Sequence, residues 1–502
     1  MAERERHAGE LAAARGEVER LVAIIKELQR HRFGRRAERL DADQLALALE
    51  DLEQMLAAAQ AAEEEENGKK PMRSSPQRRI NRGALPPHLP REQVIIDVAD
   101  KTCLCCGGLK HRIGEDVSER LDVTPAQFKV LVVHRPKYAC RACEGEVAQA
   151  PAPERLIENG IPTEALVAHV IVAKYADHLP LYRQAQIYAR QGVALDRSTL
   201  ADWVGRAAFT LRPVYVRLLE GLKSSTKLFA DETTAPVLDP GRGRTKTGQL
   251  WAYARDDRPW GGPEPPGVAY VYAPDRKHER PAVHLAGFKG TLQVDGYGAY
   301  ASLAERGDVV LAFCWSHVRR RFYEIQVASP APIAAEALAR IGALYAIEAD
   351  IRGCSAEERH RVRLSRSKPL ADALKPWLEL QLATVSGKST IAEAIRYALT
   401  RWAGLTHFLD DGRIEIDSNA VERAIRPIAL GRKNHLFAGS DGGADHWAIL
   451  ASLIETCKRN GVDPQVYLAD VLSRIVDRHP INRIDELLPF AYVKPTPVKA
   501  VA

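Results

Sequence analysis

The stretches Lys227-Leu-Phe-Ala-Asp231 and Thr291-Leu-Gln-Val-Asp295 decide the fold, because each is a short apolar run that ends in an aspartate. Such runs, bounded by turn residues, are typical of buried strands. Similar runs cover residues 249–253, 268–272 and 309–313, and a helical stretch covers 281–286. The three runs at 227–231, 249–253 and 268–272 follow one another along the chain and predict a meander. The whole pattern predicts a mixed α/β fold.

The two aspartates at the strand ends are candidates for a metal site. Side chains at the ends of neighbouring strands can converge at one edge of a sheet, where clustered carboxylates repel one another unless a cation lies between them. A pair of Mg²⁺ ions would meet that need and would support in-line phosphoryl displacement. Taken singly, an aspartate at a strand end also serves as a turn or cap residue, so spacing alone leaves both interpretations open.

Five of the eight cysteines lie in one short region. Two Cys-x-x-Cys pairs stand there, formed by Cys103, Cys106, Cys140 and Cys143. Pairs of this spacing are typical of one tetrahedral structural Zn²⁺, with Cys105 as the spare thiol and residues 127–134 as a strand that returns the second pair to the first. A redox dithiol and coincidence are the alternatives. The scattered remaining cysteines argue against a disulfide framework.

The N-terminal region has two rows of regularly spaced apolar residues. The first runs from Leu11 to Leu28 in steps of three and four, as a coiled coil requires, and the second runs from Leu45 to Leu56. Between them, Arg35 and Arg36 are candidate DNA contacts. The alternative is a helix pair that packs on its own protein. Residues 61–91 are highly charged and indicate a linker, either solvated or lying along DNA.

Residues 163–204 follow a helical pattern with a break at Leu179-Pro180 and a turn at Gly192. Helix, glycine-containing turn and helix resemble a helix-turn-helix, with Arg197 at the start of the second helix as a candidate DNA contact. Any small helical bundle offers such turns, so this signal is weak by itself.

Bulk properties limit the class of protein. A chain of 502 residues suggests three or four domains, and its net charge of +6 is too small to identify a polyanionic partner. We find no apolar run of about 18 residues that would span a membrane. The charged N-terminus lacks the apolar core of a signal peptide, so we expect a cytoplasmic protein.

Several motifs together carry a family resemblance. They are Phe229-Ala-Asp-Glu-Thr, Leu292-Gln-Val-Asp-Gly-Tyr-Gly-Ala-Tyr300, Cys314-Trp-x-His-x-Arg-Arg-x-Phe322 and Asp417-Ser-Asn-Ala-Val-Glu-Arg-Ala-Ile-Arg-Pro. The chain resembles the insertion-sequence 66 family of bacterial transposases over nearly its whole length. The segment from Asp417 to Asn434 is the most specific match.

The resemblance implies an RNase H-like catalytic core whose acids map onto Asp231, Asp295 and Glu422. These acids would bind two Mg²⁺ or Mn²⁺ ions, and one structural Zn²⁺ would bind to the cysteine pairs. It also implies DNA as partner (element ends and target), a homo-oligomer on DNA, and small accessory proteins of the same element. No covalent protein intermediate is needed, because metal-activated water and then the freed 3′-hydroxyl act as nucleophiles.

Basic residues gather near the proposed catalytic acids. His317 and Arg320 follow the fifth strand, and the segment around Glu422 carries four more candidates, Arg423, Arg426, Arg432 and Lys433. We interpret them as contacts to the DNA backbone. The alternatives are a solvated basic helix face and an i,i+4 ion pair between Glu422 and Arg426.

The expected domains follow the chain in order. They are 1–60 coiled-coil helices, 61–91 linker, 92–150 zinc finger, 151–224 helix-turn-helix-like segment, 225–445 catalytic core with a helical insertion at about 331–410, and 446–502 C-terminal helices. The predicted function is end binding, metal-dependent cleavage and strand transfer. The main alternative is a catalytically inactive DNA-binding regulator, and a third, a self-associating structural protein, leaves the carboxylates unexplained.

Overall fold

The computed structural model describes residues 127–138, 148–157, 160–239, 244–328 and 330–493. The chain divides into two units, 1–125 and 126–502, and all described residues belong to the second. The expected coiled coil and charged linker lie outside the described residues. In the described part, no helix is both long and apolar enough to cross a membrane.

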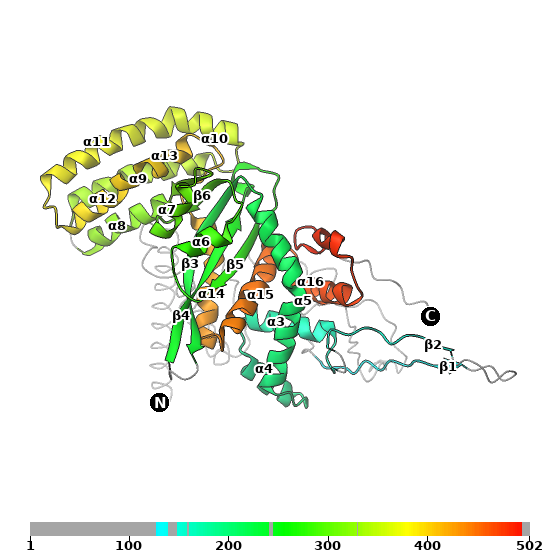
Figure 1. Ribbon diagram of the computed structural model, residues 1–502. Helices are drawn as coiled ribbons and strands as arrows, with labels where there is room; N and C mark the ends of the chain where they lie inside the picture. The colour runs from blue at the N-terminus through cyan, green and yellow to red at the C-terminus, as the bar shows by residue number, and fades with distance from the viewer. Residues whose placement is uncertain (1–126, 139–147, 158–159, 240–243, 329, 494–502) are drawn as a thin grey trace, which may run out of the picture. The chain divides into compact units, whose positions relative to one another are not determined.

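A five-stranded mixed sheet forms the centre of this unit (Figure 1). Its strands are β3 (Lys227–Asp239), β4 (Arg244–Arg255), β5 (Gly267–Ala273), β6 (Gly290–Val294) and β7 (Val309–Phe313), in the spatial order β5-β4-β3-β6-β7. Strands β3, β4 and β5 form an antiparallel meander, whereas β6 and β7 run parallel to β3. The five strands predicted between residues 227 and 313, the meander and the mixed α/β core are confirmed.

Helices that precede and follow the sheet in the chain pack against it or against one another. They are α3 (Glu164–Tyr175), α4 (Leu181–Arg190), α5 (Arg197–Lys223), α14 (Asn419–His435), α15 (Asp441–Arg459) and α16 (Pro464–Val476). Helix α14 packs on β3 and β4, and α15 packs on the edge strand β5. The Ser452 hydroxyl of α15 accepts a hydrogen bond from the backbone N–H of Tyr270 at 2.8 Å, and Thr456 does the same for Val268 at 3.1 Å. Two N–H groups of the edge strand are thereby satisfied.

The helical pattern expected between residues 163 and 204 is confirmed. Helix α4 ends at Arg190, Gly192 turns the chain with a φ of +80°, and α5 begins at Arg197. Helix α5 has 27 residues, and its apolar face, which includes Trp203 and Leu211, is buried in the main core. This helix therefore packs into the core of the sheet domain and is also the second helix of the helix-turn-helix-like segment.

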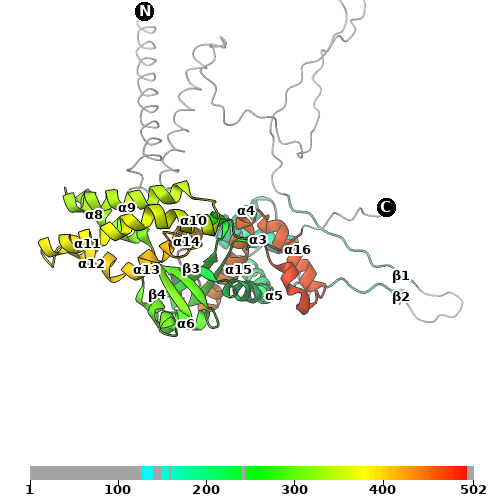
Figure 2. The ribbon, with the colours of Figure 1, turned by 90° about the horizontal axis from the view of Figure 1, so that it is seen from above.

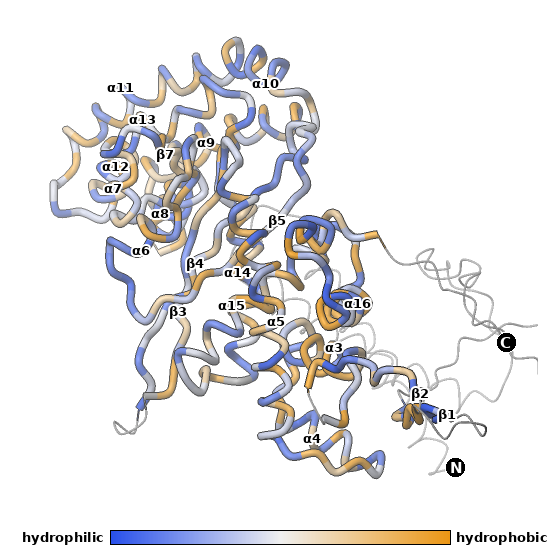
Figure 3. The backbone as a smooth tube through the Cα atoms, turned by 45° about the vertical axis from the view of Figure 1, so that its right-hand side comes forward, coloured by the Kyte–Doolittle hydropathy of each residue, from blue (hydrophilic) through white to orange (hydrophobic). Residues whose placement is uncertain are grey.

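The segment of the chain between β7 and α14 forms a second helical layer. It consists of α8 (Trp315–Ala328), α9 (Pro332–Asp350), α10 (Ala356–Val362), a π-helical turn (Arg363–Ser367), α11 (Lys368–Thr384), α12 (Thr390–Thr400) and α13 (Trp402–Thr406). Figures 1 and 2 show α8, α9, α11 and α12 side by side. The tube of α11 alternates between hydrophilic and hydrophobic colours in Figure 3, as expected of an amphipathic helix. Its apolar residues help form a separate core around Trp315 and Phe322.

Short elements connect these layers. They are α6 (Glu279–His284), α7 (Ala301–Ala304) and 3₁₀ turns at Arg258–Trp260, Gly298–Tyr300, His407–Leu409 and Ile481–Leu487. Helix α6 confirms the helical stretch expected at 281–286.

The strand expected at residues 127–134 is wrong. These residues have no regular secondary structure, and Val130 is 88% exposed. A strand needs a partner for its backbone groups, and the pairing begins only afterwards, where β1 (Lys137–Tyr138) meets β2 (Ala148–Gln149) in antiparallel register.

Candidate active site

The parallel register of the sheet places Asp231 beside Asp295. Phe229 of β3 is paired with Gln293 of β6, and both aspartates stand two residues further along. Because side chains alternate along a strand, a step of two residues returns to the same face. The two carboxylates therefore project side by side, just beyond the end of β6.

The same register extends to the next strand. Val294 of β6 is paired with Phe313 of β7, so the following positions, Asp295 and Cys314, are also neighbours. Cys314 is buried, and its sulfur accepts a hydrogen bond from the backbone N–H of Ser418 at 3.2 Å. Asp231, Asp295 and Cys314 thus form a row across three parallel strands.

Helix α14 brings Glu422 to this row. The loop before it is fixed to β6 by Gln293, whose side chain donates to the carbonyl of Glu415 at 2.9 Å and accepts from its N–H at 3.0 Å. The helix then begins at Asn419, and Glu422 lies one turn inside, where the Ser418 hydroxyl donates to its carboxylate at 3.3 Å. The predicted helix start is confirmed.

The three carboxylates are close enough to affect one another. Burial and, after it, the negative charges of Glu232, Asp295 and Glu422 raise the pKa of Asp231 to about 7. A backbone hydrogen bond from Glu232 acts in the opposite direction. A bound cation would remove this repulsion.

His317 stands on α8 beside Glu422. Its Nδ1 lies 3.8 Å from the Glu422 carboxylate, and the ligand atoms of Cys314, His317 and Glu422 all lie within 4.8 Å of one another. A hydrogen bond with Cys314 raises the pKa of His317 to about 9 against the effect of burial, and the charges of Glu422 and Asp295 act in the same direction. Our sequence analysis identified His317 but missed Cys314, although the Cys-x-x-His spacing was visible.

The two neighbouring acids of the same segment, Glu415 and Asp417, have other partners. Glu415 pairs with the buried Arg359 at 2.8 Å. Asp417 accepts two hydrogen bonds from Asn419, one from its backbone N–H at 3.1 Å and one from its side-chain amide at 2.7 Å. Glu422 is the acid of this segment whose negative charge raises the pKa of Asp231.

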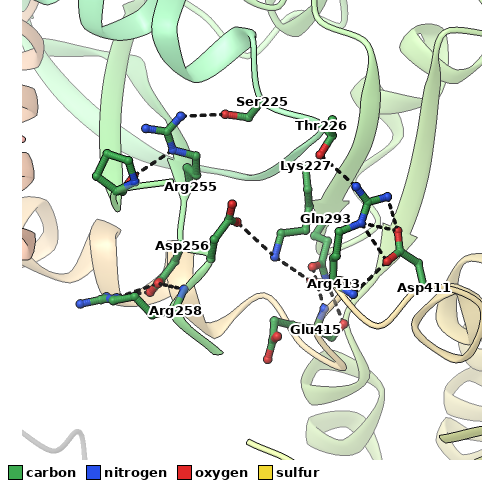
Figure 4. Close-up of polar contacts among 12 residues, drawn as sticks. Ser225, Thr226, Lys227, Arg255, Asp256, Arg258, Gln293, Asp411, Arg413 and Glu415 are labelled. Atoms are coloured by element: carbon green, nitrogen blue, oxygen red, sulfur yellow. Dashed lines mark hydrogen bonds and ion pairs between the residues drawn. The ribbon is translucent and has the colours of Figure 1, made fainter. Parts of the chain in front are cut away.

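The start of β3 carries a cluster of paired charges (Figure 4). The buried Lys227 donates to the carbonyl of Arg413 at 2.9 Å and lies 4.0 Å from Asp257. Arg413 forms a forked ion pair with Asp411 at 2.7 Å. Burial lowers the pKa of Lys227, and the surrounding carboxylates oppose that effect.

The candidate DNA contacts lie in different surroundings. Arg197 is exposed at the start of α5, Arg320 is exposed but pairs with Glu324 at 3.0 Å, and Arg432 donates to the backbone and side chain of Thr234. Three others are exposed along α14, namely Arg423, Arg426 and Lys433.

The alternative ion pair between Glu422 and Arg426 does not occur among the described residues, where Glu422 contacts Ser418 and His317 instead. The remaining predicted residues lie outside the described part of the chain: Arg35, Arg36, Cys103, Cys106, Cys140 and Cys143.

These features define a mixed α/β protein with an acidic cluster at the end of its central parallel strands. Family models cover most of the chain. The model of the transposase IS66 family matches residues 159–446, and that of the IS66 C-terminal element matches 452–490. The chain belongs to the IS66 family of transposases. Its family domain is of the DDE type, which implies transposase catalysis, a divalent metal and DNA binding.

Two further models match the N-terminal part. The zinc-finger binding domain of transposase IS66 covers residues 100–144, which include both cysteine pairs and imply zinc. A model described as transposase C of IS166 homeodomain covers residues 20–94.

Full-length relatives are similar to this chain. Uncharacterized protein y4jD of Sinorhizobium fredii (strain NBRC 101917 / NGR234) is 47% identical over 94% of both chains. Uncharacterized protein y4qI of the same strain is 45% identical over 98% of this chain and 94% of its own length.

Proposed function

We propose that this protein is the transposase of an IS66-type insertion sequence, which binds the element ends and catalyses strand cleavage and transfer of the 3′-hydroxyl into target DNA. The convergence of Asp231, Asp295 and Glu422 carries this proposal. Two come from adjacent parallel strands and the third from a helix that Gln293 fixes to the same strand end.

An RNase H-like core is supported by the topology of the sheet. The sheet begins with a meander, and the first strand of this meander lies at the centre of the sheet. Two strands that run parallel to this central strand follow. We further propose that the layer between α8 and α14 is a helical insertion in this core, and we retain the other domain boundaries given above.

The donor set fits hard divalent ions. Asp231, Asp295 and Glu422 offer carboxylate oxygens, the ligands that Mg²⁺ and Mn²⁺ prefer. When bound, two such ions supply Lewis-acid activation of the attacking oxygen and stabilisation of the leaving oxygen. The protein's part is to hold the three carboxylates in place and to keep the scissile phosphate beside them.

Cationic side chains near the acids would hold the DNA. His317 contacts the Glu422 carboxylate, and Arg423 and Arg426 extend from the same helix as Glu422 into solvent. Guanidinium groups form strong, charge-assisted hydrogen bonds to phosphates. Together with Arg320, Arg432 and Lys433, these residues make a basic surface beside the site, while Arg197, Arg35 and Arg36 would contact DNA further away.

We assign one structural Zn²⁺ to Cys103, Cys106, Cys140 and Cys143. The support is their tetrahedral-site spacing and the zinc-finger model over residues 100–144. Purified protein should contain one Zn²⁺ per chain, which Cys140→Ser should lose and Cys105→Ser should retain. Metal analysis that finds full zinc retention in Cys140→Ser would refute the assignment.

We further propose that the protein acts on DNA in the cytoplasm as a homo-oligomer, together with small accessory proteins of the same element. The test uses full-length protein, Mg²⁺ and duplexes carrying the sequences that flank its gene, with nicked and joined products resolved on denaturing gels. Wild-type protein should produce both products, and binding should weaken steeply with salt. Specific binding without cleavage would favour the DNA-binding regulator instead.

A further inference from the structure

The turn that carries Asp295 is tied to the helical layer. The Tyr397 hydroxyl of α12 donates to the backbone carbonyl of Asp295 at 2.6 Å. One turn later, Arg401 donates to the carbonyl of Gly296 at 3.2 Å. Two consecutive carbonyls of this turn therefore accept hydrogen bonds from residues more than a hundred positions away.

Two arginines fix the ring of Tyr397. The guanidinium carbon of Arg401 lies 4.0 Å from the ring centroid, and that of Arg321, from α8, also lies at 4.0 Å. Cation–π contacts at this distance are favourable. The hydroxyl is thus held in one position by groups from two helices.

Gly296 permits this close approach. Its φ is +96°, which side chains rarely allow, and a Cβ atom there would lie 2.5 Å from Nε of Arg401. Glycine at this position therefore admits both the turn and the arginine.

The carboxylate of Asp295 is also oriented from within the turn, because it accepts a hydrogen bond from the backbone N–H of Tyr297 at 2.7 Å. We propose that Tyr397 is a positioning residue for Asp295: it holds the backbone of the turn so that the carboxylate faces Asp231 and Glu422. This inference rests on the proposed function. Tyr397 acts through a backbone carbonyl, so it does not touch the reacting atoms.

The experiment compares wild-type protein with Tyr397→Phe, which keeps the ring and its cation–π contacts but removes the hydroxyl. Mn²⁺ binding to the full chain, followed by electron paramagnetic resonance, should weaken about two- to tenfold, which corresponds to one hydrogen bond. The Mn²⁺ concentration for half-maximal cleavage should rise by a similar factor, and excess Mn²⁺ should restore the rate. DNA affinity should stay unchanged.

Three further variants make the result decisive. Arg401→Gln disturbs the same turn and should also weaken Mn²⁺ binding, whereas Tyr323→Phe, at another half-buried tyrosine of the helical layer, should not. Asp295→Asn tests the proposed function itself and should abolish cleavage. Wild-type cleavage by Asp295→Asn would refute that function. Loss of cleavage in Asp295→Asn together with wild-type Mn²⁺ binding in Tyr397→Phe and Arg401→Gln would refute only the positioning role.

Discussion

The start and the middle of β3 carry charged residues in opposite arrangements. At its start, Lys227 lies among the carboxylates of Asp257, Glu415 and Asp256, and the acids nearby have cationic partners. Four residues later, Asp231 lies near further carboxylates, and burial together with their charges raises its pKa. One strand therefore connects a cluster of paired charges with a cluster of carboxylates that is only partly paired, by Arg276 with Glu232 and by His317 with Glu422.

The difference separates structural charges from functional ones. A buried charge is tolerated when a partner and hydrogen bonds replace its water. Like charges gathered without such partners destabilise the fold, and they persist where a ligand is to be bound. Lys227 and Glu415 therefore belong to the structural group, and Asp231 and Glu422 belong to the candidate site.

The largest expected effect comes from Glu422→Gln, which keeps size and hydrogen bonding but removes a charge that holds metal. Cleavage and joining should fall by on the order of 10³ or more, as expected for loss of a group that stabilises transition-state charge. DNA binding should persist. Gel assays with Mg²⁺ measure both, and the matched variant Glu305→Gln, at an exposed acid, should behave like wild type.

The next effect concerns the contribution to stability of the paired cluster at the start of β3. Arg359→Met removes the partner of Glu415 and one partner of Glu348, so it should lower the free energy of unfolding by about 3–5 kcal/mol. Arg206→Met breaks an exposed pair with Asp202 and should cost about 1 kcal/mol or less. Urea denaturation compares them, and equal losses would remove the distinction between buried and exposed pairs.

The pH dependence of stability tests the carboxylate cluster around Asp231. The pKa of Asp231 is about 7 in the folded protein and 3.8 for the free side chain, so between these values the folded state binds more protons than the unfolded state. Without added Mg²⁺, this group therefore makes the protein less stable as pH rises from about 4 to 7, by about 1.4 kcal/mol for each pKa unit.

Thermal unfolding of wild-type protein and Asp231→Asn isolates this contribution, which the asparagine variant should lack. Mg²⁺ should raise the melting temperature of wild type more at pH 8 than at pH 5. An equal Mg²⁺ effect at both values would contradict the coupling between metal and Asp231.

The smallest expected effect is that of Asp417→Asn. An asparagine can still accept the hydrogen bond from the N–H of Asn419, so cleavage should change by only a few-fold. If this variant abolished cleavage while Glu422→Gln kept it, the third carboxylate would be Asp417.

Much of the sheet could be predicted from local sequence. The runs at 249–253 and 268–272 lie inside β4 and β5, because apolar residues bounded by turn residues form buried strands. Strand β3 continues to Asp239 through the polar pair Thr233-Thr234, since pairing with β4 extends it beyond its apolar part. The run at 127–134 failed for the converse reason, as its apolar residues meet no partner strand.

The site was predictable only in part. Asp231 and Asp295 end short apolar runs, a local feature that made them candidates, whereas the family resemblance assigned them a metal-binding role together with Glu422, and helix phase favoured Glu422 among the neighbouring acids. The links through Cys314 and Tyr397 depend on strand register and on packing between distant helices, which local patterns do not encode. The spacing of Tyr397 and Arg401 on one helix face was the one local hint.

The helical layer also determines when the acids of the candidate site are translated. Because it separates Asp295 from Glu422, the third acid is translated 127 residues (422 − 295) after the second. At roughly 5–20 residues per second, this interval lasts about 6–25 s. During that interval the nascent chain holds two of the three proposed metal-binding acids, so the proposed site can form only after the helical layer has been translated.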